Sequence, residues 1–588
     1  MKYNRNWIMI LLGTLAMTVS CSDFLDPMLD GSLTEDQVFQ NAAYFNGVLN
    51  TVYSNVPTQY DKKLDGATDN AVINITGNNY YRLANQNLSP NFNPTDNWTS
   101  NFLQIRRINQ FLERMVLDHD NPDFLTPVRF RPLHTRNDSI DNINTFYRML
   151  GEAYFLRAFF QFELLRAFGG EGVNGQMLGY PIVTRVLKVD EDLNLARNTY
   201  MESVRQIVND CDSAAKYLPL EYKGTNAVLG QTMNGRANGI AALALKARTL
   251  LYAASPAYNQ AGDIQLWEEA AIAAGDAIRA IGGLQNLAPY ENYHFTQLNN
   301  QAFQIRDIFF RGNVQGGNRA YENRNYPPGM FGSGEVNPSQ NYVNAFPDRN
   351  GFPISESTLY NADNPYAERD PRLDLYVAVN ESRLGPGNYY TVQTYEGGRD
   401  APNPSRQNSR TGYYLKKLLR PGTVQLITTD LRSTARAAIH LGAPELYLNF
   451  AEAAFEAWGP TGDPQAYGYT AQTVLARVLQ RYGAGNQYLN TVAVNDPAKF
   501  RKLVRNERRL ELSFEGHYFW DVRRWAAGND VSGLNTQVYG VRITRDGSGA
   551  YQYELNVPLE RREFSTQYMP ISYQELYKTS NLVQNKGW

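Results

Sequence analysis

The densest group of charged side chains lies near the C-terminal end and is the first place to look for chemistry. Between Arg505 and Arg524 the chain combines arginines and glutamates with an aspartate and a histidine. Glu511 and Glu515 are four residues apart, so on a helix both carboxylates would lie on one face. A pair of carboxylates about 5 Å apart beside a cleft is the arrangement of a retaining glycosidase. The spacing therefore permits a surface glycosidase.

A structural role explains the same segment better. Arginine and glutamate side chains three or four residues apart on a helix form ion pairs. Large aromatic residues in and directly after the segment favour its burial, among them Phe514, Phe519, Trp520 and Trp525. We therefore predict that these charges stabilise the fold and do not catalyse a reaction.

No other pattern supplies a catalytic or metal site. The sequence has no nucleophile elbow, no phosphate-binding loop, no dinucleotide fingerprint and no zinc-protease motif. The five histidines, at positions 119, 134, 294, 440 and 517, are not spaced as metal pairs. We expect a protein that is not an enzyme and that uses no cofactor and no metal.

The first 21 residues are typical of an export signal. Basic residues precede an apolar run over 8–19, which ends just before Cys21. The run is shorter than the roughly 20 residues that a membrane span needs. We predict a signal peptide over 1–20 and a lipid attached to Cys21, the alternative being a plain signal peptide. Only Cys211 then remains, which excludes a disulfide framework and a cysteine-based zinc site.

Composition narrows the class of partner. The net charge is -2 and there is no basic run, which argues against a nucleic-acid partner. The chain has 39 Tyr, 27 Phe and 7 Trp, many of them in loops rich in asparagine. Because tyrosine combines an apolar ring with a polar tip, such loops suit a polar ligand with apolar faces.

Apolar periodicity predicts a helical scaffold. Thr34 and Gln37 form a capping-box pattern that opens a helix through Val52. Further helices are expected over 98–112, 146–168, 198–217, 240–251, 266–281, 446–457 and 470–482. Several have alanine-rich faces, which let antiparallel helices approach closely, as in tetratricopeptide-like repeats. We therefore expect a mainly α fold with a tetratricopeptide-like scaffold of helix pairs.

Two segments lack this periodicity and are expected to form a loop-rich, partly irregular ligand-binding lobe. They are rich in Gly, Asn and Tyr, and their aromatic content argues against disorder. After the signal peptide we expect a lipid-anchored tether over 21–33 and a single body over 34–588. In that body the scaffold occupies mainly 34–56, 98–118, 146–282 and 436–525, and the loop-rich lobe mainly 57–97 and 283–435.

Residues 508–525 closely resemble the C-terminal hallmark of the SusD/RagB family of Bacteroidetes outer-membrane nutrient-binding lipoproteins. Further segments resemble family motifs: Cys21–Asp26, Trp98–Asn109, Ala345–Gly351, Arg369–Leu373 and Leu446–Ala453. The chain departs from the pattern at Tyr518, where arginine is common, and at Asn344, where aspartate is usual. The resemblance extends over nearly the whole chain.

The resemblance implies a function that the residues alone do not reveal. Family members lie as lids on a TonB-dependent, SusC-like transporter barrel and pass oligosaccharides, or in some cases peptides, into the periplasm without enzymatic activity. It also implies that Cys21 anchors the chain to the outer membrane with its body exposed at the cell surface. The leading hypothesis is a surface glycan-binding lipoprotein, and the alternatives are a peptide-capturing homologue, a surface glycosidase and a purely structural scaffold.

The ligand contacts are expected from aromatic loops and not from the family motifs. A sugar ring has apolar faces and polar rims, so it requires flat aromatic side chains bordered by polar groups. The candidates in the first part of the chain are Tyr80, Tyr81, Arg82, Trp98 and Asn101. Those in the second part are Tyr290, Tyr293, Tyr321, Tyr326 and Tyr342. The neighbourhood of Trp98 is the leading candidate, because family sites often use it.

Overall fold

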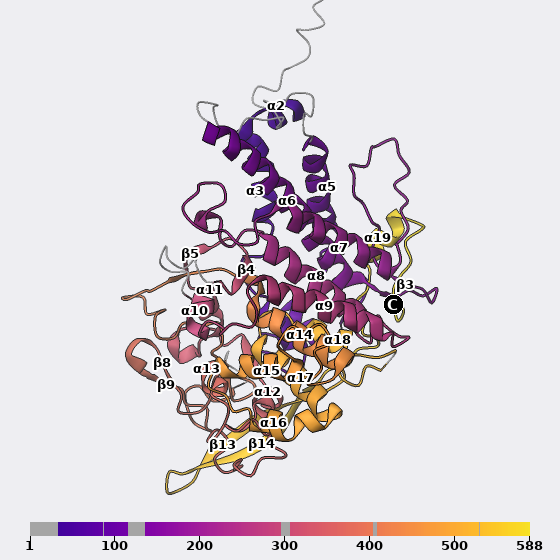
Figure 1. The fold of residues 1–588 in the computed structure, drawn as a ribbon. Coiled ribbons are helices and arrows are strands. Elements are labelled where there is room, and N and C mark those ends of the chain that lie inside the picture. Colours follow the sequence, from indigo (N-terminus) through magenta and orange to yellow (C-terminus); the bar gives the residue numbers. More distant parts are fainter. Residues whose placement is uncertain (1–32, 86, 116–135, 296–305, 404–407, 529) are drawn as a thin grey trace, which may run out of the picture.

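The computed structural model describes residues 33–588 except 86, 116–135, 296–305, 404–407 and 529 (Figure 1). The predicted signal peptide, Cys21 and nearly all of the predicted tether lie outside the described residues. Among the residues that are described, no helix combines the length and apolar character needed to cross a bilayer.

Long helices form the scaffold that the sequence predicted. They are α5 (Trp98–Arg114), α6 (Arg136–Phe168), α7 (Tyr200–Tyr217), α8 (Gly239–Ala254), α9 (Ile264–Ala280), α14 (Ala443–Trp458) and α15 (Ala471–Gln480). Each packs against the next in this order, through fully buried small residues such as Ala241, Ala271 and Ala453 (Figure 1). The mainly α, tetratricopeptide-like fold class is thus confirmed.

Two helix boundaries differ from the prediction. The capping box at Thr34 and Gln37 is present, but α2 (Glu35–Gln40) ends early and α3 (Ala42–Ser54) begins anew. The Asn41 side chain causes this break, because it accepts hydrogen bonds from the N–H groups of Ala43 and Tyr44 at 2.9 and 3.3 Å. Helix α6 begins at Arg136, well before the predicted residue 146. The sequence did not indicate this start, because the first turns of the helix are mostly polar and carry no apolar stripe.

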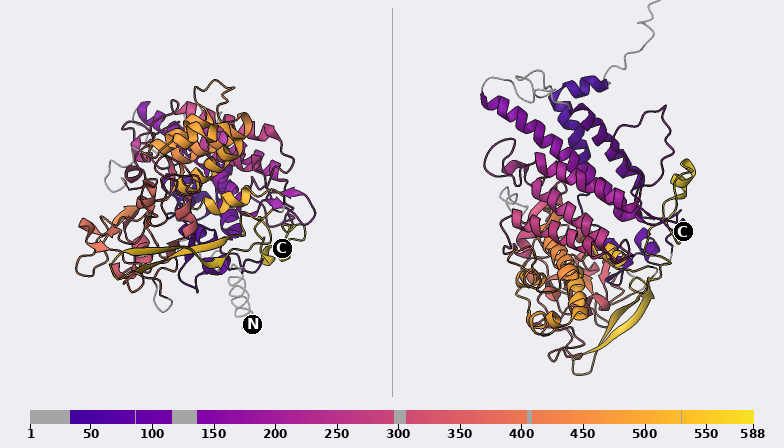
Figure 2. Two further views of the ribbon diagram at one scale, coloured as in Figure 1. Left: turned by 90° about the horizontal axis from the view of Figure 1, so that it is seen from below. Right: turned by 45° about the vertical axis from the view of Figure 1, so that its right-hand side comes forward.

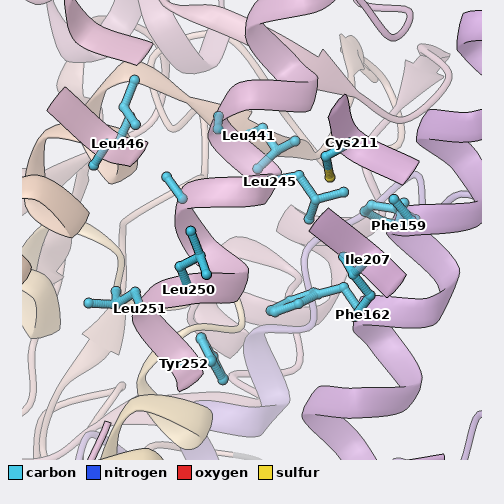
Figure 3. Close-up of a cluster of buried hydrophobic side chains, with 14 of the residues drawn as sticks. Phe159, Phe162, Ile207, Cys211, Leu245, Leu250, Leu251, Tyr252, Leu441 and Leu446 are labelled. Carbon is cyan, nitrogen blue, oxygen red and sulfur yellow. The ribbon is translucent and has the colours of Figure 1, made fainter. Parts of the chain in front are cut away.

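The core of the scaffold lies where α6, α7 and α8 meet. Figure 3 shows Phe159 and Phe162 of α6 with Ile207 and Cys211 of α7 and Leu245 and Tyr252 of α8. The Phe162 ring is edge-on to Tyr252, with ring centres 5.3 Å apart. Burial raises the pKa of the Cys211 thiol well above its ordinary value. Cys211 is therefore a packing residue.

The loop-rich segments have their own core, which consists largely of tyrosine and aliphatic side chains. Its short elements are η2 (Lys62–Ala67), β1 (Ala71–Ile73), α4 (Asn79–Ala84), α10 (Tyr290–Phe295), α11 (Ala320–Asn325), η6 (Pro328–Met330), β6 (Val336–Pro338), α12 (Gln340–Ala345) and α13 (Arg372–Tyr376). Antiparallel pairing of β1 with β6 sets Ala71 opposite Pro338 and so joins the two segments.

The other strands of the described residues also form two-stranded sheets. They are β2 (Gly170–Glu171) with β3 (Met177–Leu178), β4 (Ile308–Arg311) with β12 (Ile439–Gly442), β5 (Gln315–Asn318) with β11 (Thr434–Arg436), β7 (Val377–Ala378) with β10 (Tyr414–Leu415), and β8 (Arg383–Leu384) with β9 (Tyr390–Thr391). The remaining helices are η3 (Gln231–Met233), η7 (Pro386–Asn388), α16 (Gln487–Thr491), η8 (Ala493–Asn495) and α19 (Tyr573–Lys578).

A C-terminal hairpin was not anticipated. Strands β13 (Gln537–Arg545) and β14 (Tyr551–Arg561) pair at the end of the molecule opposite to α3 and α5 (Figures 1 and 2). The turn is held by Asp546, whose carboxylate accepts from the N–H groups of Ser548 and Ala550 at 2.9 and 3.0 Å. Alternating apolar residues on either side of this Gly-rich turn are a recognisable hairpin signal.

Most pairs of the charged C-terminal cluster join different elements of the fold. Helix α17 (Pro497–Glu511) ends before Glu515, so Glu511 and Glu515 do not share a helical face. Both side chains are buried, Glu511 paired with Arg481 and Glu515 with Lys417. The predicted structural role of the cluster therefore agrees with the geometry, and one predicted helical pair is present, Asp521 with Arg524 on one helix.

The strongest pairs link α18 (Tyr518–Arg524) to α14. Arg524 donates to both carboxylate oxygens of Glu452 at 2.7 and 2.6 Å, and to Asp521 at 2.8 Å. Arg372 likewise bonds Glu507 at 2.8 Å and Asp370 at 2.7 Å. Buried charges of this kind are tolerated only when their partners are present.

His440 makes the stability of the fold depend on pH. Its ring packs on Phe159 and Phe310, and Nε2 donates to the Pro57 carbonyl at 2.7 Å. Burial lowers the pKa of His440 to about 4. An unfolded histidine titrates near 6.5, so the unfolded state takes up the proton first as pH falls. The contribution of His440 is therefore complete above pH 6.5 and is lost progressively as pH falls from 6.5 to about 4.

We expect the His440→Gln variant to lose less stability than the wild type between pH 7 and pH 4.5, by roughly 1–3 kcal/mol. Glutamine retains a donor for the Pro57 carbonyl but cannot titrate. Denaturant unfolding at the two pH values gives the comparison. Equal losses in the two proteins would show that the fold does not lower the pKa of His440.

Candidate functional site

Two of the ten predicted ligand residues, Tyr80 and Tyr321, come together in one recess. Tyr80 lies on α4 and Tyr321 on α11, far apart in the sequence. The recess has a volume of about 250 Å³ and is called the Tyr80 recess below. It is lined by Gln59, Tyr60, Asp61, Lys62, Lys63, Tyr80, Tyr321, Arg324 and Glu335.

The loops around β1 and β6 position the walls of the Tyr80 recess. The Glu335 N–H donates to the Arg324 carbonyl at 2.7 Å, and the Asn74 N–H donates to the Glu335 carbonyl at 2.8 Å. The Asn78 side chain donates to Glu335 at 3.0 Å and accepts from the Tyr80 N–H at 2.9 Å. Asn78 thus caps α4 and connects it to the opposite wall.

The Tyr80 recess combines aromatic rings with charges of both signs. The Tyr80 hydroxyl donates to Asp61, whose pKa is raised by burial in spite of this bond. Glu335 lies 3.6 Å from Lys63 and 3.9 Å from Arg324, which are loose contacts. Lys63 and Arg324 can donate hydrogen bonds to the hydroxyl groups of a ligand beside the half-buried Tyr80 ring, and Glu335 can accept them.

Lys62 is unusual within this set. Its Nζ lies 3.4 Å from the centre of the Tyr321 ring and has no hydrogen-bond partner among the residues that the structure describes. Burial, reinforced by the nearby Arg436, lowers the pKa of Lys62 well below its usual value. Because the ammonium covers the Tyr321 ring, this ring is a wall of the recess and Tyr80 is its more accessible aromatic group.

Trp98 lies in a different cavity, an apolar groove of about 350 Å³. The ring is only 7% exposed and packs on Phe102 and Phe168, with centres 5.1 Å away in each case. Aliphatic side chains such as Leu187 and Leu193 form most of the groove. Such a surface offers few partners for sugar hydroxyls, so it is less suited to a glycan than the Tyr80 recess.

Three other candidates lie near these cavities without lining either. Asn101 is buried, and its amide nitrogen lacks a partner within the described part of the chain. Tyr81 is half-buried, with the Arg410 guanidinium 5.5 Å from its ring centre. Arg82 is exposed and lies 4.0 Å from the centre of the Phe92 ring.

The last four candidates are core residues: Tyr290, Tyr293, Tyr326 and Tyr342. The Tyr290 hydroxyl accepts from the Leu418 N–H at 2.9 Å, and the Tyr326 hydroxyl donates to the Val424 carbonyl at 3.0 Å. The Tyr342 hydroxyl bonds Ser513 at 2.7 Å. All four rings are buried, and the hydroxyls of Tyr290, Tyr326 and Tyr342 are engaged, so these residues are less suited to ligand contact than Tyr80.

Sequence reasoning missed the charged residues of the Tyr80 recess. Asp61, Lys63, Arg324 and Glu335 lie on short helical turns or in the loops beside them, in segments that show no motif. Their only common feature is proximity in the fold, which no spacing in the sequence reveals. Within the described residues, no group of three or more His, Cys, Asp or Glu side chains could hold a metal ion.

Two family models match the chain. Residues 304–588 match the SusD family, and residues 23–251 match a family described as starch-binding associating with outer membrane. Between them they include all of the elements that form the Tyr80 recess. None of the curated proteins matches the chain significantly.

Solved structures share the fold over nearly its whole length. A SusD-like protein from Bacteroides fragilis is 22% identical with a TM-score of 0.71, over 94% of this chain and 99% of the other. A SusD-like carbohydrate-binding protein from the same species is 20% identical with a TM-score of 0.67, over 92% and 99%. A SusD homologue from Bacteroides thetaiotaomicron is 18% identical with a TM-score of 0.62, over 95% and 99%.

At these identities the solved structures establish the fold alone, and the two family models carry the assignment. The motifs noted in the sequence, from Trp98–Asn109 to residues 508–525, fall within the matched regions. This chain belongs to the SusD family.

Proposed function

We propose that this protein captures oligosaccharides at the surface of the outer membrane and delivers them to a partner TonB-dependent, SusC-like transporter. The observation that carries the proposal is the Tyr80 recess, where a half-buried aromatic ring lies beside Glu335, a carboxylate that is paired only loosely with Lys63 and Arg324. The carbohydrate-binding description of a structural neighbour and the outer-membrane description of the family model support it.

The attachment to the membrane and the partnership with the transporter are part of the same proposal. A lipid on Cys21 would tether the body through residues 22–33 and let it move over the transporter while it stays at the surface. No catalytic step is included, because Glu511 and Glu515 are engaged in buried ion pairs.

Peptide capture is the second candidate, and the apolar groove at Trp98 favours it. Exposed aliphatic side chains border that groove, together with Arg106, Arg185 and Lys188. An apolar peptide would find there the contacts that a sugar would lack. Glycan binding and peptide binding should therefore depend on different residues of this chain.

We expect Arg324→Ala to weaken glycan binding about tenfold, which corresponds to 1.4 kcal/mol. Its side chain is 58% exposed and reaches Glu335 only at 3.9 Å, so stability should hardly change. Native gels containing soluble polysaccharides would identify a ligand, and calorimetric titration would compare the variants.

Arg82→Ala is the matched control for Arg324→Ala. Arg82 is an exposed arginine on the same short helix as Tyr80, but it does not line the Tyr80 recess. Its removal should leave the affinity for the glycan unchanged. Equal losses in both variants would contradict the assignment of the recess, and selective binding of peptides would contradict the glycan proposal.

A further inference from the structure

The turn between α11 and β6 displays a phenylalanine in a conformation that suits glycine. Phe331 has φ 66° and ψ 17°, which is the left-handed region, and its side chain is 66% exposed. A bulky residue in this region is an outlier. Glycine at this position would avoid both the steric conflict and the exposure of an apolar ring.

The surroundings hold this turn rigidly. Buried Asp400 accepts from the Tyr390 hydroxyl at 2.6 Å and from the Gln393 N–H at 2.9 Å, and it also bonds the backbone of Gly329. A Cβ atom on Gly329 would lie 1.8 Å from the Tyr390 hydroxyl oxygen, so the turn and the Tyr390 loop touch. Strained residues persist where the neighbouring structure over-determines them, and such positions cluster at ligand sites.

The same turn runs directly into a wall of the Tyr80 recess. The N–H groups of Ser333, Gly334 and Glu335 donate back to the carbonyls of Asn323, Tyr326 and Arg324 at 3.0, 3.0 and 2.7 Å. Arg324 and Glu335 both line the recess. Phe331 therefore projects from the segment that ends in the recess.

A second exposed ring lies on the loop clamped to this turn. Tyr389 is 47% exposed and precedes Tyr390, whose hydroxyl bonds Asp400. The Tyr389 ring packs edge-on against Tyr390, with ring centres 6.3 Å apart. Phe331 and Tyr389 are both large exposed rings on these joined loops. They offer flat apolar surfaces whose position is fixed before a ligand arrives.

We propose that Phe331 is an aromatic platform on which an outer sugar residue stacks when an oligosaccharide occupies the Tyr80 recess. The inference rests on the proposed function and extends it, because it names a residue outside the recess and requires a ligand longer than the recess alone can hold. The apolar C–H face of a pyranose ring is the chemistry that the Phe331 ring would recognise.

Phe331→Gly separates binding from packing. The variant removes the ring and relieves the left-handed strain, so its melting temperature should equal or exceed that of the wild type, while the affinity for the oligosaccharide falls about tenfold. Phe331→Trp keeps a platform and should bind within about threefold of the wild type, a change below 1 kcal/mol. Calorimetric titration and thermal unfolding of the full mature protein give both readouts.

Tyr577→Ala controls for the loss of an exposed ring elsewhere. Tyr577 is 85% exposed on α19, across the molecule from α11 in Figure 1, and its removal should not change the affinity. Unchanged binding by Phe331→Gly, or a lower melting temperature of that variant, would overturn the inference. If the wild type binds no glycan at all, the proposed function itself fails and the platform with it. If the wild type and Phe331→Gly bind the glycan equally well, only the inference about Phe331 is refuted and the proposed function stands.

Discussion

Replacing Glu452 by alanine is expected to lower the free energy of unfolding by about 3–5 kcal/mol. Glu452 is 2% exposed and accepts two hydrogen bonds from Arg524 and one from the Trp525 indole N–H at 2.6 Å. It also lies 3.4 Å from Arg508. Its loss would leave two buried guanidinium groups to share the Asp521 carboxylate, and the helices α14, α17 and α18 would lose their common anchor.

An exposed ion pair provides the control for Glu452. Glu554 on β14 pairs with Arg542 on β13 at 2.7 Å, but its side chain is 60% exposed. Glu554→Ala should cost less than about 1 kcal/mol, because solvent screens such pairs. Denaturant unfolding followed by circular dichroism compares the two variants. Similar small losses would contradict the structural role of the C-terminal cluster.

Replacing Phe162 by alanine is the second change with a large expected effect, about 3–5 kcal/mol of stability. The side chain is fully buried between α6 and α8, where it meets Tyr252 (Figure 3). Removing the ring would leave a cavity in a region where the helices are already close packed, so the neighbouring side chains could fill it only in part. Denaturant unfolding measures the loss.

Tyr44→Ala is the matched control for Phe162→Ala. Tyr44 is an aromatic residue on α3 that is 48% exposed, and its removal should change the stability by no more than about 0.5 kcal/mol. If Phe162→Ala were as mild as this control, the junction of α6, α7 and α8 would not be the core of the scaffold.

Much of the helical scaffold could be predicted, because the residues that each helix buries recur in the sequence with the period of a helix. The stripe through Ile240, Ala247 and Leu251 repeats at helical spacing, and α8 follows it closely. The break between α2 and α3 was not predicted, because it depends on one polar side chain, Asn41. Such a capping residue interrupts the helix but leaves the apolar pattern of the sequence unchanged. The β13–β14 hairpin carried a readable alternation in its sequence and was overlooked.

Less of the candidate site could be predicted, because residue type does not reveal burial. Tyr80 and Tyr342 are the same amino acid on similar short helices, but one borders an open recess and the other is fully buried against Ser513. Nor does spacing reveal which charges meet, since Lys63 approaches Glu335 from a segment more than 200 residues away in the sequence. The family motifs gave no guide to the ligand site, because Arg372, Arg508 and Arg524 are buried in ion pairs.

The most direct test of the central claim is a crystal structure of the protein with the oligosaccharide that the polysaccharide gels identify. We predict sugar hydroxyls within hydrogen-bond distance of Asp61, Arg324 or Glu335, one sugar ring beside Tyr80 and an outer ring stacked on Phe331. A sugar bound in the apolar groove at Trp98, with the Tyr80 recess empty, would contradict this account.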